Sequence, residues 1–96
     1  SIAVFGGAAG IPADLSNAVA ASTGALNLAN GGDTVMLKDS AGAVVDSFTY
    51  ASSLASVDGV SMNRSPDATA AGVFALHTSI AASAASPGKR ANGSDF

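Results

Sequence analysis

The segment from residue 33 to residue 50 constrains the fold of this chain more than any other. Polar and apolar residues alternate in DTVMLK, residues 33–38, which places Val35 and Leu37 on one face of an extended strand. Residues 39–42, DSAG, supply turn-forming side chains and a glycine that tolerates a positive φ. Residues 43–50 are again rich in β-branched and aromatic side chains. The segment therefore predicts a β-hairpin.

Shorter strand signals lie on both sides of this hairpin. Residues 2–5, 60–65 and 72–78 contain short apolar runs bounded by turn residues. Pro66 ends the second of these, because proline cannot donate to a continuing ladder. Several short strands separated by turns predict an all-β fold of the sandwich or barrel kind.

Other local signals are shorter. Pro12 suits the first position of a helix and Asp14 suits its positive end, so residues 13–21 are expected to form a helical turn. Residues 27–28 predict a brief strand. Proline followed by glycine at residues 87–88 predicts a turn near the end of the sequence.

Size and charge restrict the function classes. The 96 residues suffice for one domain. Only 11% are charged, compared with about 25% in an average globular domain, and such a surface suits an extracytoplasmic module. The net charge is −3, and the four basic residues are scattered apart from the adjacent Lys89 and Arg90, which argues against nucleic-acid binding and against an anionic membrane surface. The absence of cysteine excludes disulfides and thiolate metal sites. No apolar run is long enough to predict a membrane span.

Four motifs occur in an order typical of a known domain. They are GGDTV, DSAGAVVD, SMNRSP and SPGKR, beginning at residues 31, 39, 61 and 86. In this combination the chain resembles the lamin-tail domain, particularly its bacterial versions. The resemblance implies an immunoglobulin-like β-sandwich that acts as a non-catalytic interaction or scaffolding module. Bacterial relatives are attached to secreted or cell-surface proteins, often beside hydrolases, so a secreted or cell-surface location in a bacterium is expected.

One departure from that pattern leads to a prediction about partners. The opening strands of the family have no counterpart here, so residues 1–96 are interpreted as a single, partial lamin-tail-like domain. A sandwich without these strands would expose an apolar inner face and unpaired ladder groups. We therefore expect a protein partner, either through a homo-oligomer or through a segment that complements the sheet.

No residue is predicted to carry a reaction, a cofactor or a metal. His77 is the only histidine and no G-x-S-x-G nucleophile elbow is present, so His77 is expected on the solvent side of a strand or capping a turn. The seven acidic residues are all aspartates, and none forms a pair with glycosidase spacing. Asp39, Asp58 and Asp67 are the candidates for a loop calcium site. They lack the D-x-D-x-D-G pattern, and turn formation explains them better.

A buried ion pair is the one polar contact that the sequence suggests. Asp46 shares a strand face with Phe48 and Tyr50, and Arg64 shares one with Met62. If both charges point inward, the cost of burying either alone favours a direct pair, and a surface position for either is the alternative.

Two other functions stay open at this point. The chain could be an accessory segment of a secreted hydrolase whose active site lies elsewhere. Residues 4–10, VFGGAAG, superficially resemble a dinucleotide-binding turn and would place the chain among small nucleotide-binding folds. The spacing is G-G-x-x-G rather than G-x-G-x-x-G, and Pro12 follows almost at once, so a plain glycine loop is the preferred interpretation.

Overall fold

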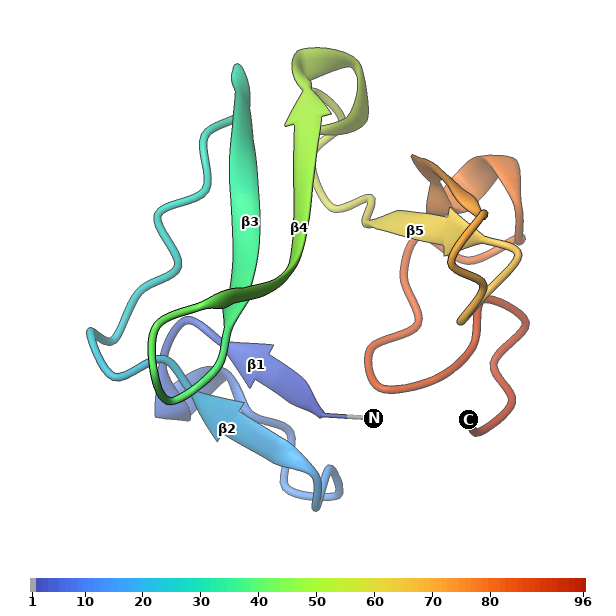
Figure 1. Ribbon diagram of the computed structural model, residues 1–96. Coiled ribbons are helices and arrows are strands. Elements are labelled where there is room, and N and C mark those ends of the chain that lie inside the picture. Colours follow the sequence, from blue (N-terminus) through green and yellow to red (C-terminus); the bar gives the residue numbers. More distant parts are fainter. Residues whose placement is uncertain (1) are drawn as a thin grey trace.

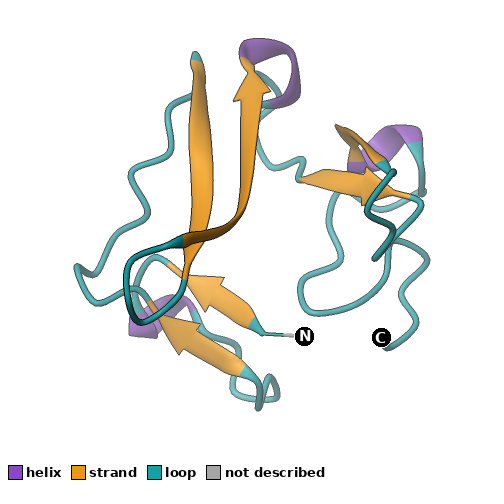
Figure 2. Cartoon of the chain, viewed as in Figure 1, coloured by secondary structure: helices purple, strands orange, loops and turns teal. Residues whose placement is uncertain are grey.

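The computed structural model describes residues 2–96, which form an all-β chain without an α-helix in that range. Figure 1 labels five of the strands and Figure 2 marks strands, short helices and loops. Three short 3-10 helices complete the secondary structure: η1 (Ala8–Gly10), η2 (Ser52–Leu54) and η3 (His77–Ser79). The all-β prediction is confirmed. The strands are β1 (Ala3–Phe5), β2 (Ala18–Ala20), β3 (Gly32–Lys38), β4 (Val44–Ala51), β5 (Met62–Ser65) and β6 (Val73–Leu76).

Within residues 2–96 the strands pair only in twos. β1 and β2 form a parallel pair, whereas β3–β4 and β5–β6 are antiparallel hairpins. Parallel strands need a long connection, here the loop through η1 that leads from β1 to β2. Because each antiparallel hairpin is a sheet of two strands, both of its outer edges are unpaired.

The β3–β4 hairpin confirms the strongest local prediction. Asp39 Oδ1 accepts hydrogen bonds from the backbone N–H groups of Ala41 and Ala43, both at 2.9 Å, as expected of a turn-forming aspartate. Gly42 has a φ of +86°, which glycine adopts without a steric penalty. One irregularity was not predicted. Lys38 pairs with Val44 although Leu37 pairs with Asp46, so β4 has an extra residue that forms a β-bulge.

Two predictions in the first third of the chain are wrong. Residues 13–21 contain β2 rather than a helical turn. The N–H of Ala3 donates to the carbonyl of Asn17 at 3.0 Å, and the N–H of Ala21 donates to that of Phe5 at 2.7 Å, so β1 satisfies backbone groups that a helix would have paired internally. Residues 27–28 are coil, in which the N–H of Leu28 bonds back to the carbonyl of Leu26.

The β5–β6 hairpin is shorter than the sequence predicts. β5 begins at Met62 rather than at residue 60, and β6 ends at Leu76 because η3 begins at His77. The N–H of Ser61 turns to the carbonyl of Ala84, at 3.0 Å. The end of this hairpin is therefore closed by the loop that follows η3 rather than by a longer ladder.

The molecule has a small core for its length. Tyr50, 3% exposed, is the only buried apolar side chain in the described part of the chain. The accessible surface is 6316 Å², whereas a compact monomer of 9.1 kDa exposes about 4,900 Å². The radius of gyration is 13.7 Å, compared with about 12.5 Å for a compact domain of this length. Much apolar surface therefore stays in contact with solvent.

Candidate functional site

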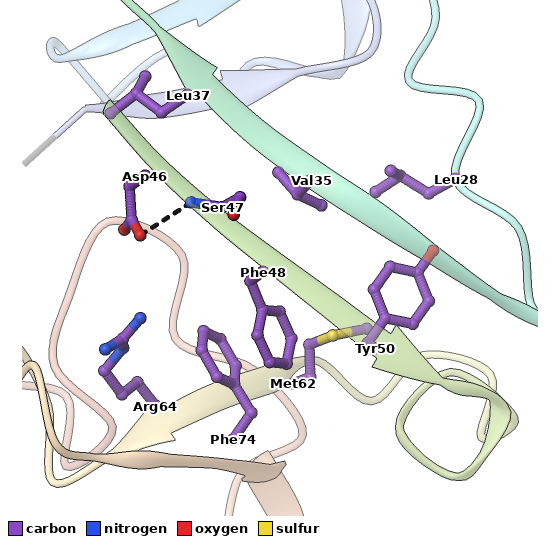
Figure 3. A pocket seen from close by; sticks show the side chains of 10 residues that line it. All are labelled: Leu28, Val35, Leu37, Asp46, Ser47, Phe48, Tyr50, Met62, Arg64 and Phe74. Atoms are coloured by element: carbon purple, nitrogen blue, oxygen red, sulfur yellow. Dashed lines mark hydrogen bonds between the residues drawn. The ribbon is translucent and has the colours of Figure 1, made fainter. Parts of the chain in front are cut away.

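An open apolar groove lies between the β3–β4 hairpin and the β5–β6 hairpin. Its volume is about 330 Å³, and Figure 3 shows the side chains that line it. We call this feature the groove. Its lining residues are Leu28, Val35, Leu37, Asp46, Ser47, Phe48, Tyr50, Met62, Arg64 and Phe74.

The register of the β3–β4 hairpin places one wall of the groove. Val35 lies directly opposite Phe48, and Leu37 lies opposite Asp46. Because side chains alternate along a strand, these residues share one face with Tyr50. Thr34 and Thr49 lie on the opposite side of the hairpin, away from the groove, and their hydroxyls are 2.8 Å apart. The face that the sequence predicts for Val35 and Leu37 is confirmed.

Three aromatic rings form the floor of the groove. The rings of Phe48 and Phe74 are stacked, with centroids 3.5 Å apart and planes at 17°. This contact joins the two hairpins (Figure 3). The Tyr50 ring lies 6.5 Å from that of Phe48, and the Tyr50 hydroxyl donates to the carbonyl of Ala29 at 3.0 Å. This hydrogen bond anchors the coil that carries Leu28 beside β3.

The two charged residues at one end of the groove do not form the predicted ion pair. Asp46 and Arg64 both line the groove, but the ion pair found among residues 2–96 joins Lys89 and Asp95, at 3.5 Å. The Arg64 guanidinium donates to the carbonyl of Ala70 at 2.9 Å. Asp46 Oδ1 accepts from the N–H of Ser47 at 2.8 Å.

Incomplete burial explains why the predicted pair is absent. Asp46 is exposed and Arg64 is half-buried, so neither carries the full desolvation cost that would force the two together. The guanidinium also lies 5.0 Å from the centroid of the Phe74 ring, which stabilises a cation without an ionic partner.

The chemistry of the groove suits apolar side chains. Seven of its ten lining residues are apolar or aromatic. The other three are Ser47 and the two charged residues, Asp46 and Arg64. Sugars and nucleotides need several convergent hydrogen-bonding groups, which a wall of this kind does not supply. An aliphatic or aromatic side chain has no hydrogen bonds to give up, and removing its apolar surface from water there is favourable.

His77 lies outside the groove and is fully buried, with 0% exposure. The expectation of a solvent-facing strand position is wrong. Nδ1 lies 2.7 Å from the carbonyl oxygen of Ser83 and donates to it, since a carbonyl only accepts. Nε2 lies 2.9 Å from Ser86 Oγ. The ring therefore ties down the loop after η3, which is close to the predicted alternative of capping a turn.

The contact between His77 and Ser86 has the distance of a base and a nucleophile, but the surroundings differ from a catalytic pair. A general base in acyl transfer must also return its proton to a leaving group. The imidazole has no exposed surface from which it could reach one. The arrangement satisfies both ring nitrogens of a buried imidazole.

Structural roles are found for two of the three candidate calcium ligands, Asp39 and Asp67, and for the glycine-rich turn. In the described residues no three His, Cys, Asp or Glu side chains come close enough to hold a metal ion. Asp67 Oδ2 instead accepts from the N–H of Ala91 at 2.9 Å, and Asp39 closes the hairpin turn. A Cβ added at Gly6 would lie 3.3 Å from the backbone nitrogen of Leu26. Glycine at this position thus permits a close approach of two backbone segments.

Sequence reasoning missed one part of the groove. Leu28 lies in coil, and its place beside Val35 depends on the Tyr50 hydrogen bond to Ala29, for which the sequence has no local signal. The sequence did place Asp46 on one strand face with Phe48 and Tyr50, and it left open whether Asp46 and Arg64 point inward.

Known proteins add no assignment to this site. None of the helices described is both long and apolar enough to cross a bilayer. Comparisons with models of protein families, with curated proteins and with solved structures found no match to this chain. The lamin-tail resemblance therefore stays a prediction that rests on its four motifs.

Proposed function

We propose that this chain is a non-catalytic interaction module that binds apolar segments of a protein partner in the groove. The observation that carries the proposal is an open, largely apolar groove with three aromatic side chains at its floor. Apolar patches of this kind on otherwise polar surfaces are typical of protein-binding sites. Arg64 and Asp46 at one end would orient the bound segment through its polar groups.

We further propose that the module is an immunoglobulin-like β-sandwich of the lamin-tail type. The order of the four sequence motifs supports this assignment. So does the packing of two antiparallel hairpins through Phe48 and Phe74, since facing sheets in a sandwich interdigitate their inner side chains. A secreted or cell-surface location in a bacterium is consistent with the low content of charged residues.

Two further observations favour binding over catalysis. The only histidine is buried and engaged at both ring nitrogens. The side chains of Asp39 and Asp67 hold turns and backbone N–H groups. If the chain is an accessory segment of a secreted hydrolase, it would contribute the same groove as a binding surface.

The test is selection of peptides that bind the groove. Panning of a displayed random peptide library is expected to enrich peptides with regularly spaced aliphatic or aromatic residues, and calorimetry would measure their affinity. Met62→Lys places a charge in the groove and is expected to weaken binding at least tenfold, which corresponds to about 1.4 kcal/mol.

Val73→Lys is the matched control. Val73 belongs to the same hairpin, is 71% exposed and does not line the groove, so its charge should leave peptide affinity unchanged. Circular dichroism would check that both variants keep the strand content of the parent. Failure to enrich any peptide, or equal effects of the two variants, would refute the proposal.

A further inference from the structure

The outer edge of β3 is unpaired. β3 bonds to β4 along one side, but among residues 2–96 no backbone hydrogen bond reaches residues 34–38 from the other side. Figure 1 shows coil running past this side of β3 without forming a strand. The N–H of Thr34 donates to Asp33 Oδ1 at 2.7 Å, and the backbone groups beyond it along such an edge are a template for another strand.

Three consecutive apolar side chains of β3 are exposed. Val35, Met36 and Leu37 have 47%, 53% and 62% of their surface in solvent. Successive side chains point to opposite faces, so β3 is exposed on both faces as well as along its edge. Runs of this kind on a folded surface are unfavourable unless another chain covers them.

The two edges of the hairpin are protected differently. β4 carries the bulge at Val45, and an extra residue twists an edge away from further pairing. β3 has no proline and no extra residue, and its charges, Asp33 and Lys38, lie near its ends. The edge of β3 is therefore the less protected of the two, and a partner strand reaches it by displacing the coil that carries Leu28.

The chain as a whole exposes more surface than a compact monomer, and the excess is larger than one partner of a standard interface buries. The chain exposes 6316 Å², about 1,400 Å² more than a compact monomer of its mass. Each partner in an interface of standard size buries about 800 Å². A second copy of this chain also brings few charges, because only 11% of its residues are charged, so repulsion between copies is small.

We propose that two copies of this chain pair through antiparallel β3 edges about a two-fold axis at Met36, an inference that rests on the proposed interaction function and names its first partner. In this register Met36 faces Met36 of the second copy, and Val35 faces Leu37 of the second copy. The neighbouring register centred on Val35 places Asp33 opposite Leu37, which opposes a carboxylate to an apolar side chain.

This pairing has a functional consequence. A two-fold axis perpendicular to the sheet joins two hairpins into one four-stranded sheet and leaves both grooves on the same face. Three or more strands also give a sheet the stability that an isolated hairpin lacks. The dimer would present two apolar grooves together and bind a partner with two such segments more tightly than one groove can.

Single-cysteine cross-linking tests the register directly, because the parent chain has no cysteine. Residues directly opposite across antiparallel strands have Cα atoms about 4.5–5.5 Å apart, within reach of a disulfide. Under mild oxidation at micromolar concentration, Met36→Cys is expected to become a covalent dimer. Val45→Cys, on the bulged edge and 64% exposed, is expected to stay monomeric. Equal or preferential cross-linking of Val45→Cys would overturn the proposal.

Light scattering coupled to size exclusion is the second readout. The parent chain is expected at twice 9.1 kDa, and Met36→Lys, which adds a charge to the edge, at the mass of one chain. A parent that stays at 9.1 kDa would overturn the dimer. Peptide affinity of the groove separates the two proposals: a monomeric parent that still binds peptides contradicts only the dimer, and a dimer that binds none contradicts only the groove.

Discussion

Phe48 and Phe74 stack with their ring centroids 3.5 Å apart, and this contact joins two hairpins that are separate sheets. Phe48 belongs to the β3–β4 hairpin, which the sequence predicts best, and Phe74 belongs to the β5–β6 hairpin, which follows it in the sequence. The same contact forms the floor of the groove. Stability and binding therefore both depend on this half-buried aromatic pair, since Tyr50 is the only buried apolar side chain among residues 2–96.

Phe74→Ala is expected to destabilise the chain by about 1–3 kcal/mol, since it removes a half-buried ring that stacks on Phe48 and joins the two hairpins. Urea denaturation followed by circular dichroism would measure the change in the free energy of unfolding. Val73→Ala is the control, because the Val73 side chain is 71% exposed, and a surface change of this kind costs at most about 0.5 kcal/mol. Similar losses for both variants would contradict a role for the ring stack.

His77→Ala is expected to cost about 2–4 kcal/mol, because it removes the donor to the carbonyl of Ser83 and leaves a cavity in place of a fully buried side chain. Hydrogen exchange should show the loss concentrated in residues 80–86, the loop that the imidazole holds. Ser86→Ala removes the contact to Nε2, at 2.9 Å, and a longer one to the carbonyl of Lys89, at 3.5 Å, and should cost about 1 kcal/mol. The histidine would be structurally unimportant if His77→Ala unfolded at the same urea concentration as the parent.

Gly32→Ala is expected to destabilise the β3–β4 hairpin by about 1–3 kcal/mol. Gly32 has a φ of +117°, and a Cβ there would lie 2.8 Å from the carbonyl oxygen of Tyr50. Gly31→Ala is the matched control, because nothing lies within 4 Å of its added Cβ. Thermal unfolding would compare the two. A midpoint for Gly32→Ala equal to that for Gly31→Ala would show that the backbone relaxes at no cost.

The parts of the fold that the sequence predicts are those decided by neighbouring residues. The β3–β4 hairpin follows from alternation along β3 and from the turn chemistry of Asp39 and Gly42, both of which act over a few residues. The end of β5 before Pro66 is local in the same way. A period of two residues also places Phe48 on one face with Tyr50, and Arg64 on one face with Met62, whatever the partner of either side chain.

Only the tertiary structure decided the contacts between distant segments. β2 forms because β1 satisfies its backbone groups, although the residues before it carry the start signals of a helical turn. Arg64 bonds to backbone carbonyls rather than to Asp46, because incomplete burial removes the need for an ion pair. His77 is buried because the loop of residues 80–86 folds over it. Burial and pairing depend on which segments meet in space, and a local pattern does not determine that.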